Sequence, residues 1–147
     1  MYHPVIDAYD GWHLAVQAWT FNRFSFYEAI DKAAAAGLDW IEAYPGQKLS
    51  PENPDAQLHH TMSQKHREAT KQKLEDSSIR VINYGVVQLP DNETECRQVF
   101  VFAKVMGIKT LQSEPPDEAF ELINNLCQEY KINVSIHNHP KPTKYWN

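Results

Sequence analysis

Short apolar segments alternate with helical segments along almost the whole chain. The strand-like segments cover residues 14–21, 40–44, 80–89, 109–113 and 133–139. Helices are predicted between them, over residues 25–36, 63–77, 92–107 and 115–130. Strands joined by single helices are expected to run parallel, with right-handed crossovers between neighbours. The sequence therefore predicts an α/β protein with a sheet of about five parallel strands.

Capping residues mark the predicted helix boundaries. Ser25 is followed three residues later by Glu28, which is the spacing of a capping box. Gly37 ends the same helix, because glycine tolerates the left-handed conformation. Ser63 begins the second helix. Between these helices, residues 47–61 are polar and contain two prolines, so they are predicted to form a long loop.

Two architectures accommodate such a sheet: an open doubly wound sheet and an arc of a (β/α) barrel. Side chains alternate between the two faces of a strand, and this alternation assigns polar positions to one face. The polar face is expected to carry Val81, Asn83, Gly85, Gln112, Glu114, Ser135, His137 and His139. An open sheet is covered by helices on both faces and needs apolar residues on both, whereas the mouth of a barrel tolerates polar ones. We therefore expect a partial TIM-barrel-like fold.

The length and composition of the chain match one domain. It has 147 residues, of which 42% are hydrophobic, and we treat 1–147 as a single unit. A complete (β/α)₈ barrel takes about 250 residues, so the chain is expected to be the amino-terminal part of one. Its first and last strands would have unpaired edges. Such edges favour pairing with another chain, here as a homo-oligomer.

Charge and hydropathy exclude several classes of partner. The net charge is −5 and no basic stripe is present, which argues against nucleic acid. No apolar run reaches the roughly 20 residues that span a bilayer, and residues 1–12 do not resemble a signal peptide. The cytoplasm is the default expectation, or the periplasm or exterior if a leader was removed. Cys96 and Cys127 have no CxxC partner and are expected to be free thiols.

Two histidines at the end of the last strand form the strongest chemical signal. If the strand continues to residue 139, His137 and His139 point to the same face. Imidazoles at the carboxyl end of a parallel strand suit a divalent metal, and Glu114 on the neighbouring strand could add a ligand or transfer a proton. The alternative is two half-buried histidines bonded to the backbone, with Glu114 an ordinary solvated carboxylate.

Other candidate residues have two open interpretations each. Glu42 lies inside an apolar strand, where it either faces the lumen mouth or forms an internal salt bridge. Trp19 forms either a wall against a sugar ring or part of the core. Lys141 either neutralises an anionic group of the substrate or is solvated, and Asn83 lies on the polar face. The histidines of residues 59–66 lack a ligand cluster and are expected at the surface.

Four segments together resemble the xylose-isomerase-like barrel enzymes, specifically the sugar phosphate isomerase/epimerase group. They are Val16–Phe21, the helix over 26–38, Trp40–Gln47 and Ile136–Pro140. The resemblance implies a (β/α)₈ barrel with a divalent metal (Mn, Mg, Co or Zn) at its carboxyl mouth. It also implies proton transfer next to the carbonyl of a sugar or sugar phosphate. Many members place a glutamate ligand at the end of the fifth strand, where this chain has His137.

The resemblance assigns a role to each candidate residue. His137 is expected to bind the metal, and Glu114 and Glu42 are expected to be catalytic. The substrate is expected to contact Trp19, Asn83, His139 and Lys141. Later strands would supply the remaining ligands, so the site in this chain is incomplete and the chain alone is expected to be inactive. The alternatives are a lyase or hydrolase acting on oxidised sugars, and a non-catalytic half-barrel assembly module.

Overall fold

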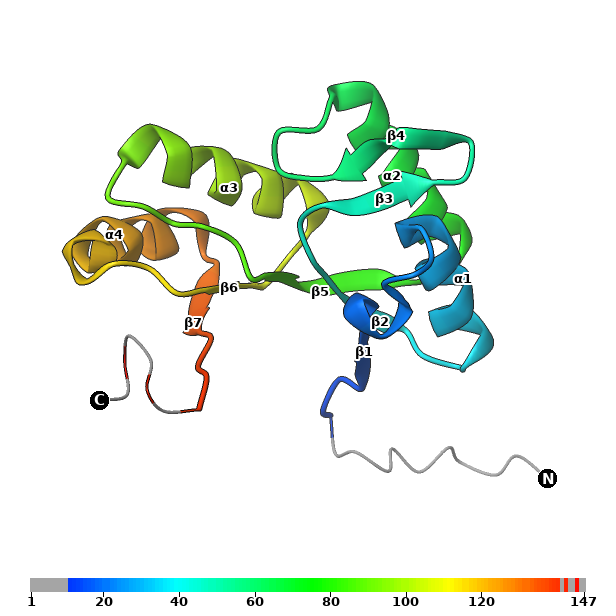
Figure 1. Cartoon of the computed structure of the whole chain (residues 1–147), viewed down its shortest axis with the longest axis horizontal. Helices are drawn as coiled ribbons and strands as arrows, with labels where there is room; N and C mark the ends of the chain where they lie inside the picture. Colours follow the sequence, from blue (N-terminus) through cyan, green and yellow to red (C-terminus); the bar gives the residue numbers. More distant parts are fainter. Residues whose placement is uncertain (1–10, 141, 143–144, 146–147) are drawn as a thin grey trace.

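Five parallel strands form the main sheet, and each lies beside the next one along the chain apart from a separate hairpin (Figure 1). The computed structural model describes residues 11–140, 142 and 145. The strands, in spatial order, are β1 Ala15–Gln17, β2 Trp40–Ala43, β5 Arg80–Gly85, β6 Thr110–Ser113 and β7 Asn133–Ile136. An open doubly wound sheet would place β1 between other strands. The observed order is that of a (β/α) barrel, which confirms the predicted partial barrel.

One α-helix connects each strand of the main sheet to the next, and the hairpin also lies between β2 and β5. These helices are α1 Phe26–Ala35, α2 Gln64–Asp76, α3 Glu93–Met106 and α4 Phe120–Tyr130, with short 3₁₀ segments η1 Ala18–Phe21 and η2 Asp117–Ala119. The predicted capping box is present at α1, where the Ser25 hydroxyl accepts a hydrogen bond from the Glu28 N–H and the Glu28 carboxylate accepts one from the Ser25 N–H. At the end of α3, Gly107 is left-handed with a φ of 74°.

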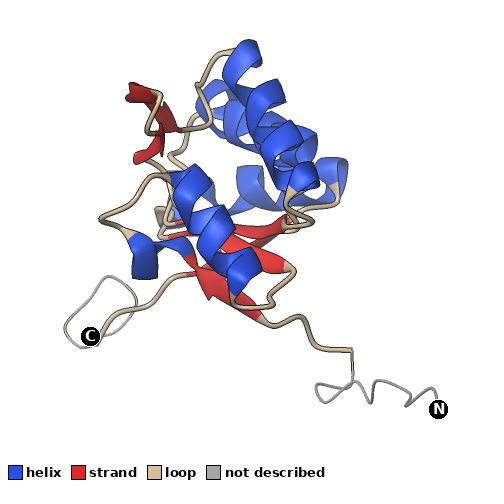
Figure 2. Cartoon of the chain, turned by 90° about the vertical axis from the view of Figure 1, so that its right-hand side faces the viewer, coloured by secondary structure: helices blue, strands red, loops and turns tan. Residues whose placement is uncertain are grey.

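The helices lie on one side of the sheet, and the core lies between the two layers (Figure 2). Ile41, Tyr84 and Leu111 come from successive strands and are fully buried against this layer. From the helices, Phe26 and Phe100 are fully buried in the same cluster. The opposite side of the strands carries polar side chains that are exposed or half-buried. One apolar face and one polar face are what the arc of a barrel requires.

The face predicted for Val81 was wrong. A register shift between Ile41 and Glu42 pairs Val81 with Ile41 and Asn83 with Glu42, so one residue of β5 is extra. Val81 therefore belongs to the buried apolar core, whereas Asn83 lies on the polar face beside Glu42. Strict alternation along a strand fails at such a bulge, and the sequence alone does not mark its position.

The predicted long loop over residues 47–61 was also wrong. It contains an antiparallel hairpin of β3 Gln47–Ser50 and β4 Asn53–Leu58. Leu49 and Leu58 are each 1% exposed and attach the hairpin to the core. The hairpin is polar in composition, and the polar average of the segment conceals these two buried leucines.

Four predicted strands end earlier than expected, the second by one residue, at Ala43. The first ends at Gln17 and continues as η1, the third ends at Gly85, and the last ends at Ile136. Within the described chain, β1 pairs with β2 alone and β7 with β6 alone, so both outer edges of the sheet are open. No helix among the described residues is long and apolar enough to cross a membrane.

Candidate functional site

Glu114, His137 and His139 come together at the carboxyl ends of β6 and β7. Glu114 directly follows β6, and the backbone N–H of His137 donates to the carbonyl of Ser113 at 3.0 Å. This hydrogen bond extends the parallel pairing by one residue and holds His137 beside the end of β6. Strand β7 ends at Ile136, but its register with β6 continues to the next residue. This pairing, rather than the length of β7, determines the position of His137.

The three side chains contact each other closely. Glu114 Oε1 lies 2.8 Å from His139 Nε2, and the rings of His137 and His139 meet edge to face with centroids 4.8 Å apart. One donor atom from each of the three residues lies within 4.8 Å of the others. The Glu114 side chain is 31% exposed and that of His139 is 52% exposed, so the group is open to solvent and to a ligand.

This donor set fits a divalent metal ion. Two imidazole nitrogens and one carboxylate oxygen are the ligands of many catalytic zinc sites, which keep a fourth position open. Ligands about 2.0–2.2 Å from one ion in a tetrahedral site lie about 3.4 Å apart, so the three ligand atoms, now within 4.8 Å of one another, have to move closer together to bind it. The carboxylate also suits Mn and Mg, so the chemistry of the donors does not select one metal.

Glu42 lies in a second group, on the polar face of the sheet. Its Oε1 accepts a hydrogen bond from the amide of Gln17 at 2.7 Å. Its Oε2 accepts from the amides of Asn83 at 3.2 Å and Gln112 at 2.8 Å. Among the described residues, no basic side chain forms an ion pair with Glu42. Of the two sequence interpretations, this arrangement favours the first, because the carboxylate faces the polar side of the sheet.

The remaining predicted site residues are placed separately. Trp19, in η1, is 58% exposed and meets Tyr44 edge to face, with centroids 5.0 Å apart, so it is not a core residue. Asn83 belongs to the Glu42 group. Lys141 lies outside the described residues. The structure thus brings three of the predicted residues together at the carboxyl ends of β6 and β7. Two others, Glu42 and Asn83, meet on the polar face of the sheet.

Sequence reasoning missed Gln17 and Gln112 as parts of the site. Gln112 was placed on the polar face but given no role, and Gln17 was read only as part of an apolar strand. Both occupy positions that pair across the sheet with polar or small residues, Gln17 with Glu42 and Gln112 with Gly85. A polar residue near the carboxyl end of each of several strands could have indicated this group. The alternation of side chains within one strand does not show it, because the group depends on which residues pair across strands.

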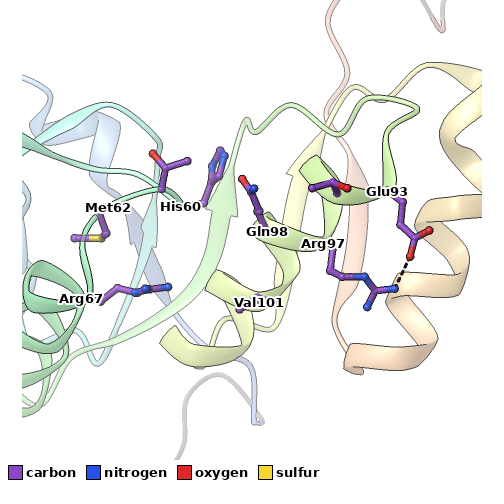
Figure 3. A pocket seen from close by; sticks show the side chains of 9 residues that line it. His60, Met62, Arg67, Glu93, Arg97, Gln98 and Val101 are labelled. Carbon is purple, nitrogen blue, oxygen red and sulfur yellow. Dashed lines mark hydrogen bonds and ion pairs between the residues drawn. The ribbon is translucent and has the colours of Figure 1, made fainter.

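A groove of about 860 Å³ lies away from the polar face, between the segment after β4 and helix α3 (Figure 3). Its lining includes Arg97, but this guanidinium already bonds Glu93 at 2.8 Å and Glu129 at 2.5 Å. His60 also lines it and is half-buried rather than a surface residue. Burial, aided by the nearby His59, lowers the pKa of His60 to about 4.

Comparison with known proteins identifies similar folds but no matching sequence family. No family model matches the sequence, and neither does any curated protein. Solved structures do match. One is an uncharacterised protein from Parabacteroides distasonis ATCC 8503, with a TM-score of 0.80 and 28% identity over 88% of this chain.

Two further solved structures are enzymes by name. One is D-psicose 3-epimerase in the presence of D-fructose, with a TM-score of 0.60, 14% identity and 85% of this chain covered. The other is a sugar phosphate isomerase/epimerase from Parabacteroides distasonis ATCC 8503, with a TM-score of 0.54, 15% identity and 92% covered. This chain covers 54% of the length of each of the three proteins. At these identities the likeness shows a shared fold: the chain has the fold of about half of each of these proteins.

Proposed function

We propose that this chain carries part of the active site of a metal-dependent sugar isomerase or epimerase. The observation that carries the proposal is the group formed by Glu114, His137 and His139 at the carboxyl ends of adjacent barrel strands. Barrel enzymes keep their chemistry at this end of the strands. The named structural neighbours that act on sugars support the choice of substrate class.

The three residues divide the work between binding and proton transfer. A bound divalent ion would act as a Lewis acid toward the carbonyl oxygen of the sugar. His137 and His139 would hold it through neutral imidazole nitrogens, and Glu114 is the carboxylate closest to them. Glu114 is also the group that we propose to accept and return the proton on the carbon next to the carbonyl, because a carboxylate can act as general base and this one lies beside the imidazoles that would hold the ion. Trp19, exposed in η1 just after β1, would provide an apolar surface for the sugar ring.

The open edges of β1 and β7 favour a second candidate, a half-barrel that functions by assembly with another chain. The same site on a barrel could also serve a lyase or hydrolase acting on oxidised sugars. The two non-isomerase candidates differ from the proposal in a measurable way: an assembly module needs no metal, and a lyase or hydrolase yields a product of a different mass.

Metal binding is the direct test. Calorimetric titration of Zn²⁺ and Mn²⁺ into the chain should show one weak site, because the described part of the lumen is open on one side. His137→Ala should weaken binding at least about tenfold, whereas His66→Ala, a half-buried histidine on α2, should not change it. Equal binding by wild type and His137→Ala would show that His137 is structural.

Activity should depend on a complete barrel. With D-fructose as the probe, we expect no turnover by this chain alone, and turnover when the remaining strands of a barrel are supplied in the same polypeptide. Glu114→Gln in that longer protein should then abolish the isomerisation while retaining the fold. A longer protein that turns over D-fructose equally well with glutamine at this position would exclude Glu114 from proton transfer.

A further inference from the structure

We propose that Glu42 is a positioning residue that orients three amide side chains, and that these amides bind the hydroxyl groups of an uncharged polyol. The inference rests on the proposed function, since it assigns the substrate class of the same site. The residues concerned are Gln17, Asn83 and Gln112, which converge on Glu42 from β1, β5 and β6. Four neighbouring strands therefore contribute to one layer of the lumen face.

The chemistry of the carboxylate determines which way the amides face. An ionised carboxylate only accepts hydrogen bonds, so each amide must turn its NH₂ group toward Glu42. The carbonyl oxygens of the three amides then point away from the carboxylate. The layer thus offers acceptors in a fixed arrangement, together with the second N–H of each amide. Hydroxyl groups both donate and accept, so a polyol is the ligand that satisfies both kinds of group.

Gly85 makes room for this arrangement. It lies on β5, between the strands that carry Glu42 and Gln112, and pairs with Gln112. A Cβ atom at this position would lie 2.5 Å from Cβ of Gln112 and 2.5 Å from its carbonyl oxygen. Because glycine lacks this atom, Gln112 can extend across β5 and reach Glu42. The glycine in β5 therefore allows the hydrogen bond between the Gln112 amide and Glu42.

The distribution of charge favours an uncharged ligand over a phosphorylated one. Among the described strands of the main sheet, the one basic residue is Arg80 at the start of β5. Its guanidinium lies over the Trp40 ring, at 5.2 Å from the centroid, near the amino ends of the strands. At the other end lie the carboxylates of Glu42 and Glu114. Without a metal, a phosphate group on this face would meet negative charge and no basic side chain of these strands.

Nuclear magnetic resonance of the side-chain amides tests the proposal in metal-free buffer. D-sorbitol is the uncharged probe and D-sorbitol 6-phosphate the charged one. In wild type, D-sorbitol should shift the NH₂ resonances of Gln17, Asn83 and Gln112, and the phosphate should shift them less. In Glu42→Gln, the three pairs of resonances should move before any ligand is added, and D-sorbitol affinity should fall about three- to tenfold.

Two further variants make the outcome decisive. Glu121→Gln changes an exposed carboxylate on α4 and should behave as wild type. If Glu42→Gln does not fold, Gln17→Leu on the exposed edge strand removes one amide and should still weaken the sorbitol-induced shifts of the other two. Equal sorbitol shifts with and without the carboxylate, stronger shifts with the phosphate, or no sorbitol shifts in folded wild type would each overturn the inference. The metal titration is independent of these shifts, so loss of the metal site and loss of the amide layer are told apart.

Discussion

His60 shows how burial of one side chain couples stability to pH. It is half-buried, its Nδ1 atom has no hydrogen-bond partner among the described residues, and its ring lies 4.0 Å from that of His59. Burial is the larger cause of its low pKa, about 4 against 6.5 for a free histidine, and repulsion from His59 adds to it. The folded state therefore favours the neutral ring, which the sequence did not indicate because the segment looked like a polar surface.

The sign of the resulting pH dependence follows from this shift. The unfolded chain binds a proton at His60 below about pH 6.5, and the folded chain does so below about pH 4. The contribution of His60 to the free energy of unfolding is therefore fully present above about pH 6.5, and it is lost as the pH falls toward 4. We expect His60→Gln to flatten the fall in unfolding free energy across this window, measured by urea denaturation at several pH values. Asn124→Gln, at an exposed and uncharged position of α4, is the control and should leave the slope unchanged. An unchanged slope in His60→Gln would show that the fall comes from other groups.

At the scale of elements, the caps and the strand pairing determine where each segment begins and ends. The capping box at the start of α1 satisfies two backbone groups of the helix end through Ser25 and Glu28. The hydrogen bond from the Ser25 side chain is also the largest cause of the lowered pKa of Glu28. The cap therefore links helix stability to the ionisation of one carboxylate.

Removal of this cap should destabilise the protein. We expect Ser25→Ala to lower the free energy of unfolding by about 1 kcal/mol, because the amide of residue 28 loses its acceptor at the helix end. Chemical denaturation followed by circular dichroism measures the loss. Ser135→Ala, at an exposed position of β7, is the matched control and should change stability by less than about 0.5 kcal/mol. A loss no greater than that of the control would mean that the cap contributes nothing to the fold.

At the scale of the whole molecule, the open sheet edges are the dominant feature. The described sheet begins at β1 and ends at β7 without closing, and apolar side chains are exposed near both edges. Ile136, the last residue of β7, is 45% exposed. Unpaired edges with apolar side chains promote association between chains.

Association through these edges is measurable. We expect the average mass of the chain in sedimentation equilibrium to rise with concentration, and Ile136→Lys to reduce this rise because a charge would be brought to the edge. Val105→Lys is the control, since Val105 is similarly exposed, at 42%, but lies on α3 rather than at an edge. Equal effects of the two variants would indicate that association proceeds through the helical surface.

The sequence by itself determined the order of the helices and of the five strands of the main sheet, the parallel direction of those strands and the position of the α1 cap. These features depend on local periodicity and on short-range backbone chemistry, both of which are written in neighbouring residues. For the same reason, the two histidines and Glu114 could be named as candidates for one site. Their positions at strand ends follow from the alternation of elements alone.

Only the tertiary structure decided how residues far apart in the chain meet. The bulge in β5 that aligns Asn83 with Glu42, the hairpin held by Leu49 and Leu58, and the convergence of Gln17 and Gln112 on one carboxylate all depend on register across strands. Register is set by the packing of whole faces against the helices, to which distant residues contribute together. A pattern within neighbouring residues does not record these combined contributions. The group of amides around Glu42 therefore follows only from the folded structure.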